Sequence, residues 1–391
     1  MIFIFLLIWL ALFSGDKIKL SDTRDINDRN HIEFYIPSYP ILVGGNLKLS
    51  ESFFGAGIQV RPPSNWAKFK INDPMHGLSK TMGMFTFKSY ALCEAPKERV
   101  QLSESKAFEG GKVQSNLGKF VSISAIAEQL PIHTLTTEAM ELYFIRHVYS
   151  NFTSFQGEYS NIHILPFPTN LFACKFPDSI EIAHWLVTGS FSNDLLTEGF
   201  LALMDNEYRI LKSWILKDAG RRRNILGASR NWLPFWDKCN LIFSKRYGRE
   251  HVIGEFKEWS STESSISVPD LVRSKSPAEV PRYSTVRGSA PVIQHPKLEN
   301  GLALGCVHLK GESKIYRYSL FVMETHYPYN ILSYSPLFAF EPYHDIEYIG
   351  SLAVRSNFDV EITHGSNDCE PRMGVFNWTM IRLYFSEYLK K

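Results

Sequence analysis

The sequence predicts an all-β protein, and three observations lead to that fold class. Short segments rich in β-branched and aromatic residues, bounded by Gly, Pro, Asn, Asp or Ser, recur along the chain. Helical periodicity is scarce, and its best candidate is residues 379–389, which could equally form a closing strand. The 391 residues are 45% apolar, 14% aromatic and 21% charged, a composition typical of a folded chain. Many short strands without intervening helices indicate an antiparallel sandwich, barrel or propeller.

The strand-like segments repeat weakly, as a propeller requires. In chain order they are residues 81–90, 119–123, 141–146, 170–174, 199–204, 240–244, 302–308, 315–323 and 359–363. A unit of roughly 50 residues, in which a polar or proline-bearing start leads into a strand, a turn and a second strand, recurs weakly among them. It covers residues 161–204, 231–253, 288–340 and 346–363. The repetition does not by itself give a number of blades.

One stretch differs from the rest in composition. Residues 260–289 hold nine serines and three prolines among charged residues, with few large apolar side chains, which is typical of loops. The segments on either side share one strand pattern, so a long inserted loop at residues 260–287 is favoured over a linker between two domains. We therefore expect a single large domain at residues 51–391, preceded by an N-terminal extension at residues 16–50.

The chain begins with an unbroken apolar run, residues 2–13, followed by Ser14, Gly15 and the charged Asp16. A run of this length suits the apolar region of a signal peptide and falls short of the roughly 20 residues that span a bilayer. No basic residue precedes it, so residues 1–15 are expected to be a signal peptide or a signal anchor, with a buried N-terminal strand as the alternative. The mature protein should be lumenal or secreted. The sequons at Asn151 and Asn377 fit that compartment.

Charge and cysteine content exclude several classes of protein. The chain has 42 Lys and Arg against 40 Asp and Glu, a net charge of +2, so it lacks the basic excess of proteins that bind nucleic acid through its phosphates. The five cysteines are widely spread and show no metal-ligand spacing, so we expect neither a metal site nor a small disulfide scaffold. One or two disulfides could form in an oxidising lumen, but buried free thiols are the commoner explanation.

Several familiar catalytic motifs are missing from the sequence. There is no G-x-S-x-G, P-loop, G-x-G-x-x-G or H-E-x-x-H, which removes the usual support for α/β-hydrolases, P-loop NTPases, Rossmann enzymes and zinc proteases. There is also no D-x-D to hold a metal on a nucleotide-sugar, and residues 345–347, Asp-Ile-Glu, come nearest. No cofactor is therefore expected.

A series of short motifs in the C-terminal third of the chain gives the sequence evidence for a function. In order they are residues 287–293, 304–308, 316–318, 331–338, 346–352 and 362–368. Upstream, residues 231–235 read Asn-Trp-Leu-Pro-Phe. Over residues 158–375 this succession resembles the five-bladed β-propeller sugar enzymes related to glycoside hydrolase family 130. That group comprises β-mannoside phosphorylases and hydrolases and related mannosyltransferases.

The resemblance implies a five-bladed β-propeller, formed by a single large domain with an inserted Ser/Pro-rich loop, that acts on carbohydrate. In a propeller the first strands of the blades surround one central channel, so polar and aromatic residues at their starts converge. The catalytic candidates are Asp368 and Glu347. The substrate-binding candidates are Trp232, as a stacking surface for a sugar, with His308, Tyr316, Asn161, His163 and Arg287.

One departure from the family pattern bears on activity. The family places a general acid in a Glu-Asp-Pro-Arg motif, and the corresponding position here is Asn161. An amide cannot donate and regain a proton at neutral pH, so ordinary phosphorolysis or hydrolysis would need another carboxylate, such as Glu158, Asp178 or Asp73. A glycosyltransferase or glycoside phosphorylase is the first hypothesis. A glycan-binding propeller without catalysis is the second, and an interaction scaffold is the third.

Overall fold

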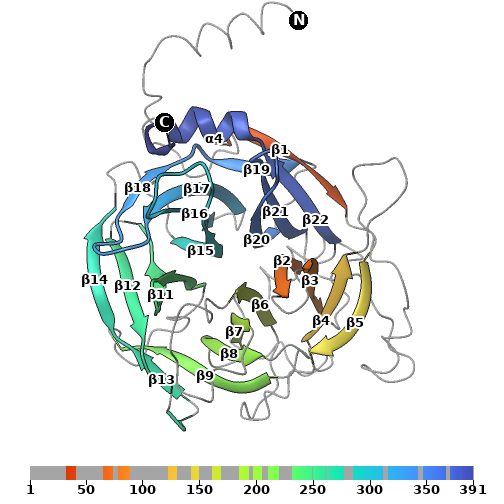
Figure 1. Ribbon diagram of the computed structural model, residues 1–391, viewed down its shortest axis with the longest axis vertical. Helices are drawn as coiled ribbons and strands as arrows, with labels where there is room; N and C mark the ends of the chain where they lie inside the picture. Colours follow the sequence, from red (N-terminus) through yellow and green to blue (C-terminus); the bar gives the residue numbers. More distant parts are fainter. Residues whose placement is uncertain are drawn as a thin grey trace, which may run out of the picture.

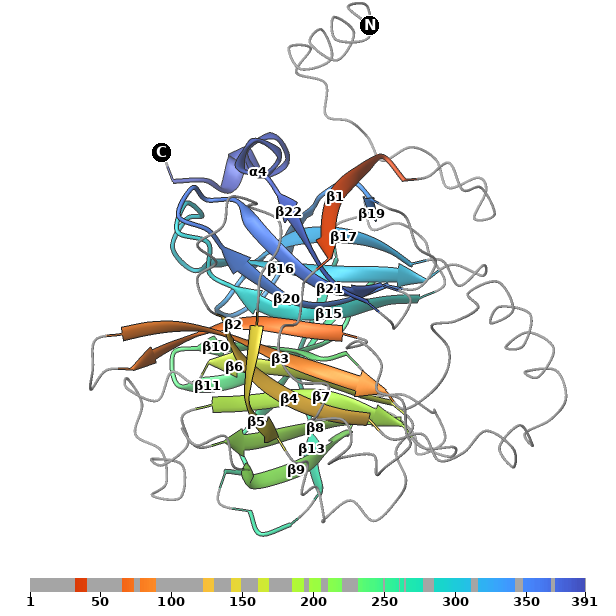
Figure 2. The same cartoon turned by 90° about the vertical axis from the view of Figure 1, so that its right-hand side faces the viewer.

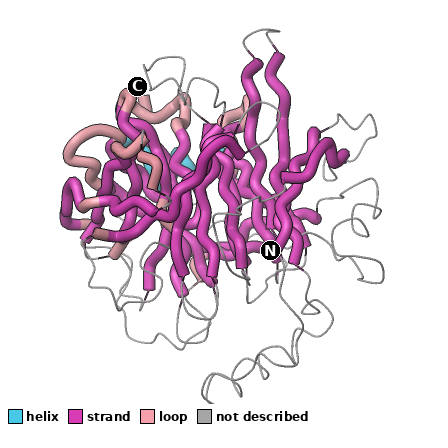
Figure 3. The backbone as a smooth tube through the Cα atoms, turned by 90° about the horizontal axis from the view of Figure 1, so that it is seen from below, coloured by secondary structure: helices cyan, strands magenta, loops and turns pink. Residues whose placement is uncertain are grey.

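A computed structural model gives the architecture. It describes residues 32–40, 65–73, 78–88, 122–129, 142–148, 161–168, 185–192, 197–204, 210–219, 231–248, 250–259, 261–263, 265–276, 285–310, 316–341, 347–366 and 370–390. These residues are nearly all in β-strands, and Figure 3 shows strands throughout with one short helix in the described part. The all-β prediction is confirmed. The predicted strand at residues 170–174, the apolar run at residues 2–13 and Asn151 lie outside the described residues.

The first two sheets are built from strands within residues 65–218, together with the later strand β13. One has the strand order β2-β3-β4-β5 and the other β13-β9-β8-β7-β6. The strands of the first are β2 (Asn65–Asp73), β3 (Leu78–Lys88), β4 (Ser122–Gln129) and β5 (Leu142–Val148). Those of the second are β6 (Asn161–Pro168), β7 (Trp185–Ser192), β8 (Thr197–Met204), β9 (Ile210–Asp218) and β13 (Ser265–Val268). In both sheets successive strands are antiparallel, except that β13 adds parallel to β9.

The third sheet is an antiparallel sheet of order β10-β11-β12-β14. Its strands are β10 (Leu233–Asp237), β11 (Asn240–Arg246), β12 (Glu250–Phe256) and β14 (Asp270–Lys275). Strands β13 and β14 lie inside the segment predicted to be a loop, which is therefore shorter than expected. Within β13 buried and exposed side chains alternate, since Ile266 and Val268 are buried while Ser267 is exposed. The pairing partner of β13 is β9, which is distant in the chain.

The remaining strands form a nine-stranded sheet of order β15-β16-β17-β19-β1-β22-β21-β20, with β18 paired to β17. The strands are β15 (Thr285–Ile293), β16 (Leu302–Lys310), β17 (Tyr316–Glu324), β18 (Ile331–Tyr334), β19 (Phe338–Glu341), β20 (Glu347–Val354), β21 (Val360–Ser366), β22 (Glu370–Phe376) and β1 (Phe34–Pro40). Strand β1 falls in the predicted N-terminal extension. It runs parallel to β19 and antiparallel to β22, and so joins two groups of strands.

The sheets are arranged around a common centre. Strands β2, β6, β15 and β20 lie nearest the centre, and β5, β9, β13 and β14 lie at the rim (Figure 1). Strand β2 contacts β6 and β20, and β15 contacts β10 and β20. Figure 2, turned by 90°, shows the sheets packed one against the next. This radial arrangement is consistent with the predicted propeller.

Apolar side chains fill the spaces between neighbouring sheets. One cluster lies between β8 and β9 on one side and β11 and β12 on the other, and includes Trp214 and Phe243. A second lies between the third sheet and β16–β18, and includes Leu233 and Phe321. Strand β17 is buried at every residue but its two ends, because other sheets cover both of its faces. Burial on both faces removes the polar alternation of a half-exposed strand.

The C-terminal segment is helical, which is one of the two alternatives that the sequence left open for residues 379–389. Helix α4 (Trp378–Phe385) and a 3₁₀ turn, Ser386–Tyr388, follow β22. Ile381 and Phe385 anchor α4 in the cluster that packs β15–β17 against β20–β22. Among the described residues, no helix has both the length and the apolar character needed to span a membrane.

Candidate functional site

A buried histidine joins polar groups from three regions of the chain near the centre of the ring. His308 lies near the end of β16, and the residues around it are Asn231, Ser289, Tyr316 and Tyr348. We call these five residues the His308 cluster. Three of them stand at or near the start of a strand: Asn231 just before β10, Tyr316 at the first residue of β17, and Tyr348 at the second residue of β20, whereas Ser289 is in the middle of β15. Strands β15 and β20 are two of the strands nearest the centre (Figure 1).

A β-bulge in β15 brings Ser289 to the imidazole. Gly288 pairs with Val307 and Ala290 with Cys306, so Ser289 is an extra residue with no partner in the ladder. A bulge turns the local strand and redirects its side chain. Here the Ser289 hydroxyl lies 2.9 Å from Nδ1 of His308. Both residues are buried, so this hydrogen bond fixes the position of the ring.

Two tyrosines flank the imidazole of His308. The ring of Tyr316, at the start of β17, lies 5.3 Å from the imidazole at an interplanar angle of 37°. The ring of Tyr348 lies at 6.1 Å and 63°, an edge-to-face contact. The Tyr348 hydroxyl donates to Oδ1 of Asn231 over 3.4 Å. The cluster therefore combines an imidazole, three aromatic or amide neighbours and a hydroxyl, the kinds of group that bind a polar ligand with an apolar face.

A glycine allows the start of β10 to approach β15 closely. A Cβ on Gly288 would lie 2.5 Å from the carbonyl oxygen of Asn231 and 2.5 Å from Cγ of Leu233, which no side chain tolerates. Asn231 has a positive φ of 61°, a conformation that Asn adopts more readily than most residues. These two residues place the Asn231 amide beside Tyr348. The motifs at residues 231–235 and 287–293 can therefore lie close together because the backbone conformation at Asn231 and the missing side chain at Gly288 permit it.

The candidate site residues predicted from the sequence have different positions relative to the His308 cluster. His308 and Tyr316 are in the cluster, and Arg287 is a half-buried residue paired in register with His308. Asn161 and His163 stand in β6, opposite Ser192 and Ser190, and Glu347 begins β20 opposite Ser366. The side chains of these last three candidates and the whole of Asp368 lie outside the described part of the chain.

Trp232 lies in a packed interior. It is 3% exposed, its ring contacts Phe243 at 5.8 Å, and Nζ of Lys245 lies 4.9 Å from its centroid. The apolar cluster around it joins the second and third sheets. In this position the indole anchors the start of β10 between the second and third sheets. Sugar stacking on Trp232 stays a prediction.

Three members of the cluster were not singled out from the sequence: Asn231, Ser289 and Tyr348. All three stand inside motifs quoted from the sequence: Asn231 is next to Trp232, Tyr348 is next to Glu347, and Ser289 is two residues after Arg287. The position of Tyr348 directly after Glu347, in the motif at residues 346–352, was an available sequence signal. No sequence signal marks the bulge that redirects Ser289.

A second Ser–His pair lies in the third sheet and has a different environment. The Ser244 hydroxyl is 2.6 Å from Nε2 of His251, and Nδ1 of His251 is 2.9 Å from the carbonyl oxygen of Tyr329. Burial lowers the pKa of His251 to about 4, partly offset by the hydrogen bond to Tyr329. Both ring nitrogens therefore hold the segment around Tyr329 against β11 and β12, in a site closed to ligands.

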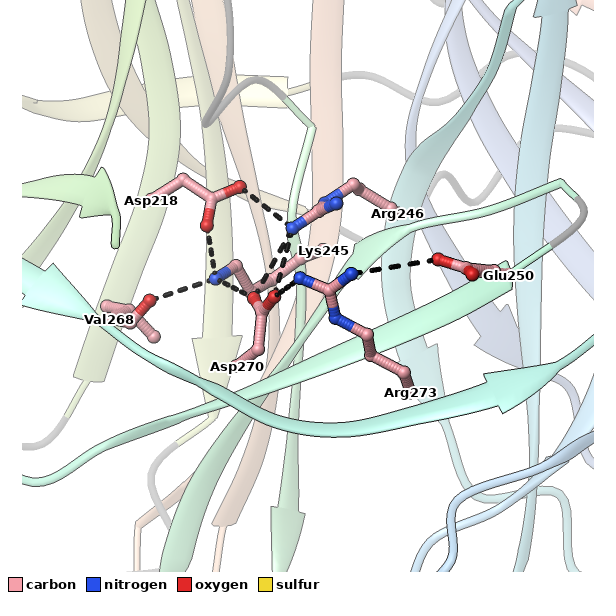
Figure 4. Close-up of polar contacts among 7 residues, drawn as sticks. All are labelled: Asp218, Lys245, Arg246, Glu250, Val268, Asp270 and Arg273. Carbon is pink, nitrogen blue, oxygen red and sulfur yellow. Dashed lines mark hydrogen bonds and ion pairs between the residues drawn. The ribbon is translucent and has the colours of Figure 1, made fainter. Parts of the chain in front are cut away.

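A cluster of charged residues fastens the second sheet to the third (Figure 4). Nζ of Lys245, the extra residue of a bulge in β11, donates to Asp218 over 2.7 Å, to Asp270 over 2.8 Å and to the Val268 carbonyl over 2.9 Å. Burial raises the pKa of Asp270, but Lys245, Arg273 and Arg246 outweigh it and hold that pKa below its ordinary value. We call Asp218, Lys245 and Asp270 the charged clamp.

Metal binding finds no support in the described residues, where no three His, Cys, Asp or Glu side chains come close enough to hold an ion. The charged clamp is not an exception, because a lysine occupies the position between its two carboxylates. The His308 cluster contains a single imidazole and no described carboxylate side chain. What it offers a ligand is therefore hydrogen bonding and aromatic contact.

No protein-family model and no curated protein sequence matches the chain. Solved structures do resemble it. The beta-1,2-mannobiose phosphorylase of Listeria innocua is 11% identical, with a TM-score of 0.49 over 82% of this chain and 90% of that one. A mannose phosphorylase of Leishmania mexicana is 9% identical, with a TM-score of 0.42 over 88% and 89%. A GDP-Man-dependent mannosyltransferase of the same organism is 10% identical, with a TM-score of 0.41 over 88% and 90%.

These structural neighbours include the kinds of enzyme that the motif order resembles. At identities of 9 to 11% and TM-scores below 0.5, these likenesses assign neither a family nor an activity to this chain.

Proposed function

We propose that the protein is a five-bladed β-propeller that acts on glycans, as a glycosyltransferase or as a phosphorylase or hydrolase of β-mannoside-like sugars. The ligand would bind where the first strands of the blades begin. The observation that carries this proposal is the His308 cluster, in which residues from position 231 to position 348 meet around one imidazole.

The strand pairing supports five blades. Strands β2–β5, β6–β9 and the third sheet make three groups of four antiparallel strands, and β13, which comes between β12 and β14 in the chain, is an addition to the second group. Within the nine-stranded sheet, β15–β17 with β18 and β19 would make the fourth. Strands β20–β22 with β1 would make the fifth, since β1 pairs antiparallel with β22 over Ser38–Pro40. Arg372 reinforces that pairing by donating to the Ser38 carbonyl over 2.6 Å and to its hydroxyl over 3.0 Å.

The chemistry of the cluster suits a sugar. A pyranose ring presents hydroxyl groups around its edge and an apolar face, and aromatic side chains with hydrogen-bonding groups match both. In this proposal His308 and Arg287 hydrogen-bond sugar hydroxyls, and Tyr316 and Tyr348 supply aromatic surface. Asn161 and His163 would contribute polar groups from the start of β6. Glu347 and Asp368 would supply the carboxylates that glycosidic chemistry needs.

A glycan-binding protein without catalytic turnover is the second candidate. Asn161, at the position where the resembled family has its general acid, favours it. The secretory lumen or the cell exterior is the proposed location for either function, with a membrane attachment only through the N-terminal segment. Cys239 is disulfide-bonded, and disulfides persist in oxidising compartments.

The test is binding followed by turnover. The protein is screened on a glycan array, and its best ligand is then incubated with inorganic phosphate, with water alone and with a sugar nucleotide. Product under one condition identifies the reaction class. Binding without product under all three identifies the non-catalytic protein, and the absence of binding to any glycan overturns both candidates.

Two variants refine this test. Asp368→Asn should retain binding and lose turnover if Asp368 is catalytic. His308→Ala should weaken binding at least about tenfold, which corresponds to about 1.4 kcal/mol. His326→Ala is the matched control, because His326 is an exposed histidine outside the cluster.

A further inference from the structure

One sequence motif plays no part in the proposed sugar site, the sequon Asn377-Trp378-Thr379. It stands where β22 ends and α4 begins. Helix α4 lies outside the ring of strands, whereas β15 and β20 lie near its centre (Figure 1). A group attached at Asn377 would therefore extend away from the His308 cluster.

The side chain of Asn377 is oriented by the helix that follows it. Asn377 has an extended backbone, with φ −71° and ψ 157°, and its Oδ1 accepts from the backbone N–H of Met380 over 2.9 Å. This is the N-cap hydrogen bond of α4. Because Oδ1 faces the helix, Nδ2 on the same planar amide is directed away from it. Asn377 is exposed, so Nδ2 reaches solvent.

The other two sequon residues fit the same orientation. Thr379 is exposed, so its hydroxyl is accessible beside Asn377. Trp378 is turned inward, with its ring stacked on His295 at 5.3 Å and 10°. Its backbone N–H donates to Oδ1 of Asp359 over 2.7 Å. The residue between the acceptor and the threonine thus fixes the segment, and the two residues that a glycosylating enzyme requires stay on the surface.

We propose that Asn377 carries an N-linked oligosaccharide. In the modification, Nδ2 of Asn377 forms a bond to C1 of the sugar and loses a proton. The bond between C1 and the phosphate oxygen of a lipid diphosphate-linked oligosaccharide breaks, and the lipid diphosphate leaves with the electron pair. The carbonyl Oδ1 is unchanged by this step, so the glycosylated residue keeps its N-cap hydrogen bond to Met380.

Two further features agree with exposure to the glycosylating compartment. Residues 2–13 form the apolar run expected of a signal peptide or a signal anchor. Cys239 is disulfide-bonded. Neither of these two features depends on the sugar site, so the proposed modification of Asn377 is independent of the proposed function.

The test is peptide mapping of the full chain expressed in a eukaryotic cell. The peptide that contains Asn377 is measured by mass spectrometry before and after treatment with an amidase that releases N-glycans and converts the attachment asparagine to aspartate. We expect a glycopeptide before treatment and aspartate at position 377 afterwards. Recovery of this peptide only with unmodified asparagine overturns the proposal, whether or not the Asn151 peptide is glycosylated.

Matched variants separate the glycan from the helix cap. Thr379→Ala should remove the glycan and keep the cap, whereas Thr379→Ser should keep both. Asn377→Asp should remove the glycan and keep the cap, because aspartate also caps helices well. Asn377→Gln should remove both and alone show a lower Tm than enzymatically deglycosylated wild type. A glycan that persists at this peptide in Thr379→Ala would contradict the assignment.

Discussion

Two regions of the molecule use the same elements for different ends. In the third sheet, Ser244 and His251 pair beside a bulge at Lys245, and near the centre Ser289 and His308 pair at a bulge in β15. In the third sheet both imidazole nitrogens are bonded to protein, and the bulged residue is locked between two carboxylates. Near the centre, the imidazole lies between two tyrosines from different strands. A bulged strand and a Ser–His pair therefore do not by themselves mark a binding site. The side chains that neighbouring strands place around the imidazole distinguish a candidate binding site from a structural hydrogen bond.

The largest effect should come from the charged clamp. Lys245→Ala should lower the free energy of unfolding by about 3–5 kcal/mol, because the fully buried Asp218 loses its closer cation, at 2.7 Å, and keeps only Arg246 at 3.6 Å. Denaturant unfolding measures this. Lys257→Ala is the control, since the Lys257 side chain is 69% exposed and its ion pair with Glu255 at 2.8 Å should be worth about 0–1 kcal/mol. A change in Lys245→Ala as small as the control would mean that the clamp does not fasten the two sheets.

The pH dependence of stability should come next. The pKa of His251 is about 4 in the folded protein against 6.5 in the unfolded chain, so the unfolded chain binds the extra proton between these values. The stabilisation is complete above pH 6.5 and is lost as pH falls toward 4, by up to about 3 kcal/mol. Unfolding of wild type and His251→Gln at several pH values isolates this contribution. Equal pH slopes for the two proteins would remove His251 as its source.

Substituting the central histidine should lower both stability and binding. His308→Ala should cost about 1–3 kcal/mol of unfolding free energy, because the buried Ser289 hydroxyl loses its partner. Glycan affinity should fall at least about tenfold in the protein that remains folded. Calorimetric unfolding and a binding titration on the same preparation give both values. Unchanged affinity in a folded His308→Ala protein would place the ligand elsewhere.

The smallest effect should come from Tyr348→Phe, which removes only a hydroxyl group. It removes one hydrogen bond of 3.4 Å to Asn231 and leaves the ring contact with His308 intact. The free energy of unfolding should change by about 0.5–1 kcal/mol. Chemical denaturation measures it. A loss as large as that of His308→Ala would show that the hydroxyl, rather than the ring, holds the cluster together.

The sequence predicted the strands whose apolar residues are contiguous, and it predicted less of the strands that depend on a partner. Residues 240–244, 302–308 and 315–323 match β11, β16 and β17, because burial on both faces leaves a visible apolar run. Strand β13 and strand β1 were expected to be a loop and an extension. Their pairing partners, β9 and the strands β19 and β22, lie far away in the chain, and local composition does not show such partners.

The sequence by itself determined the strand-rich architecture, the order of motifs around the ring and the presence of His308 and Tyr316 among the candidate residues. Only the tertiary structure decided which residue of each motif meets the others. The physical reason is that a bulge shifts a side chain by one position, as at Ser289, and that a missing Cβ at Gly288 lets Asn231 approach β15. Both effects act on the backbone across neighbouring strands. A pattern of residue types along one strand contains no record of them.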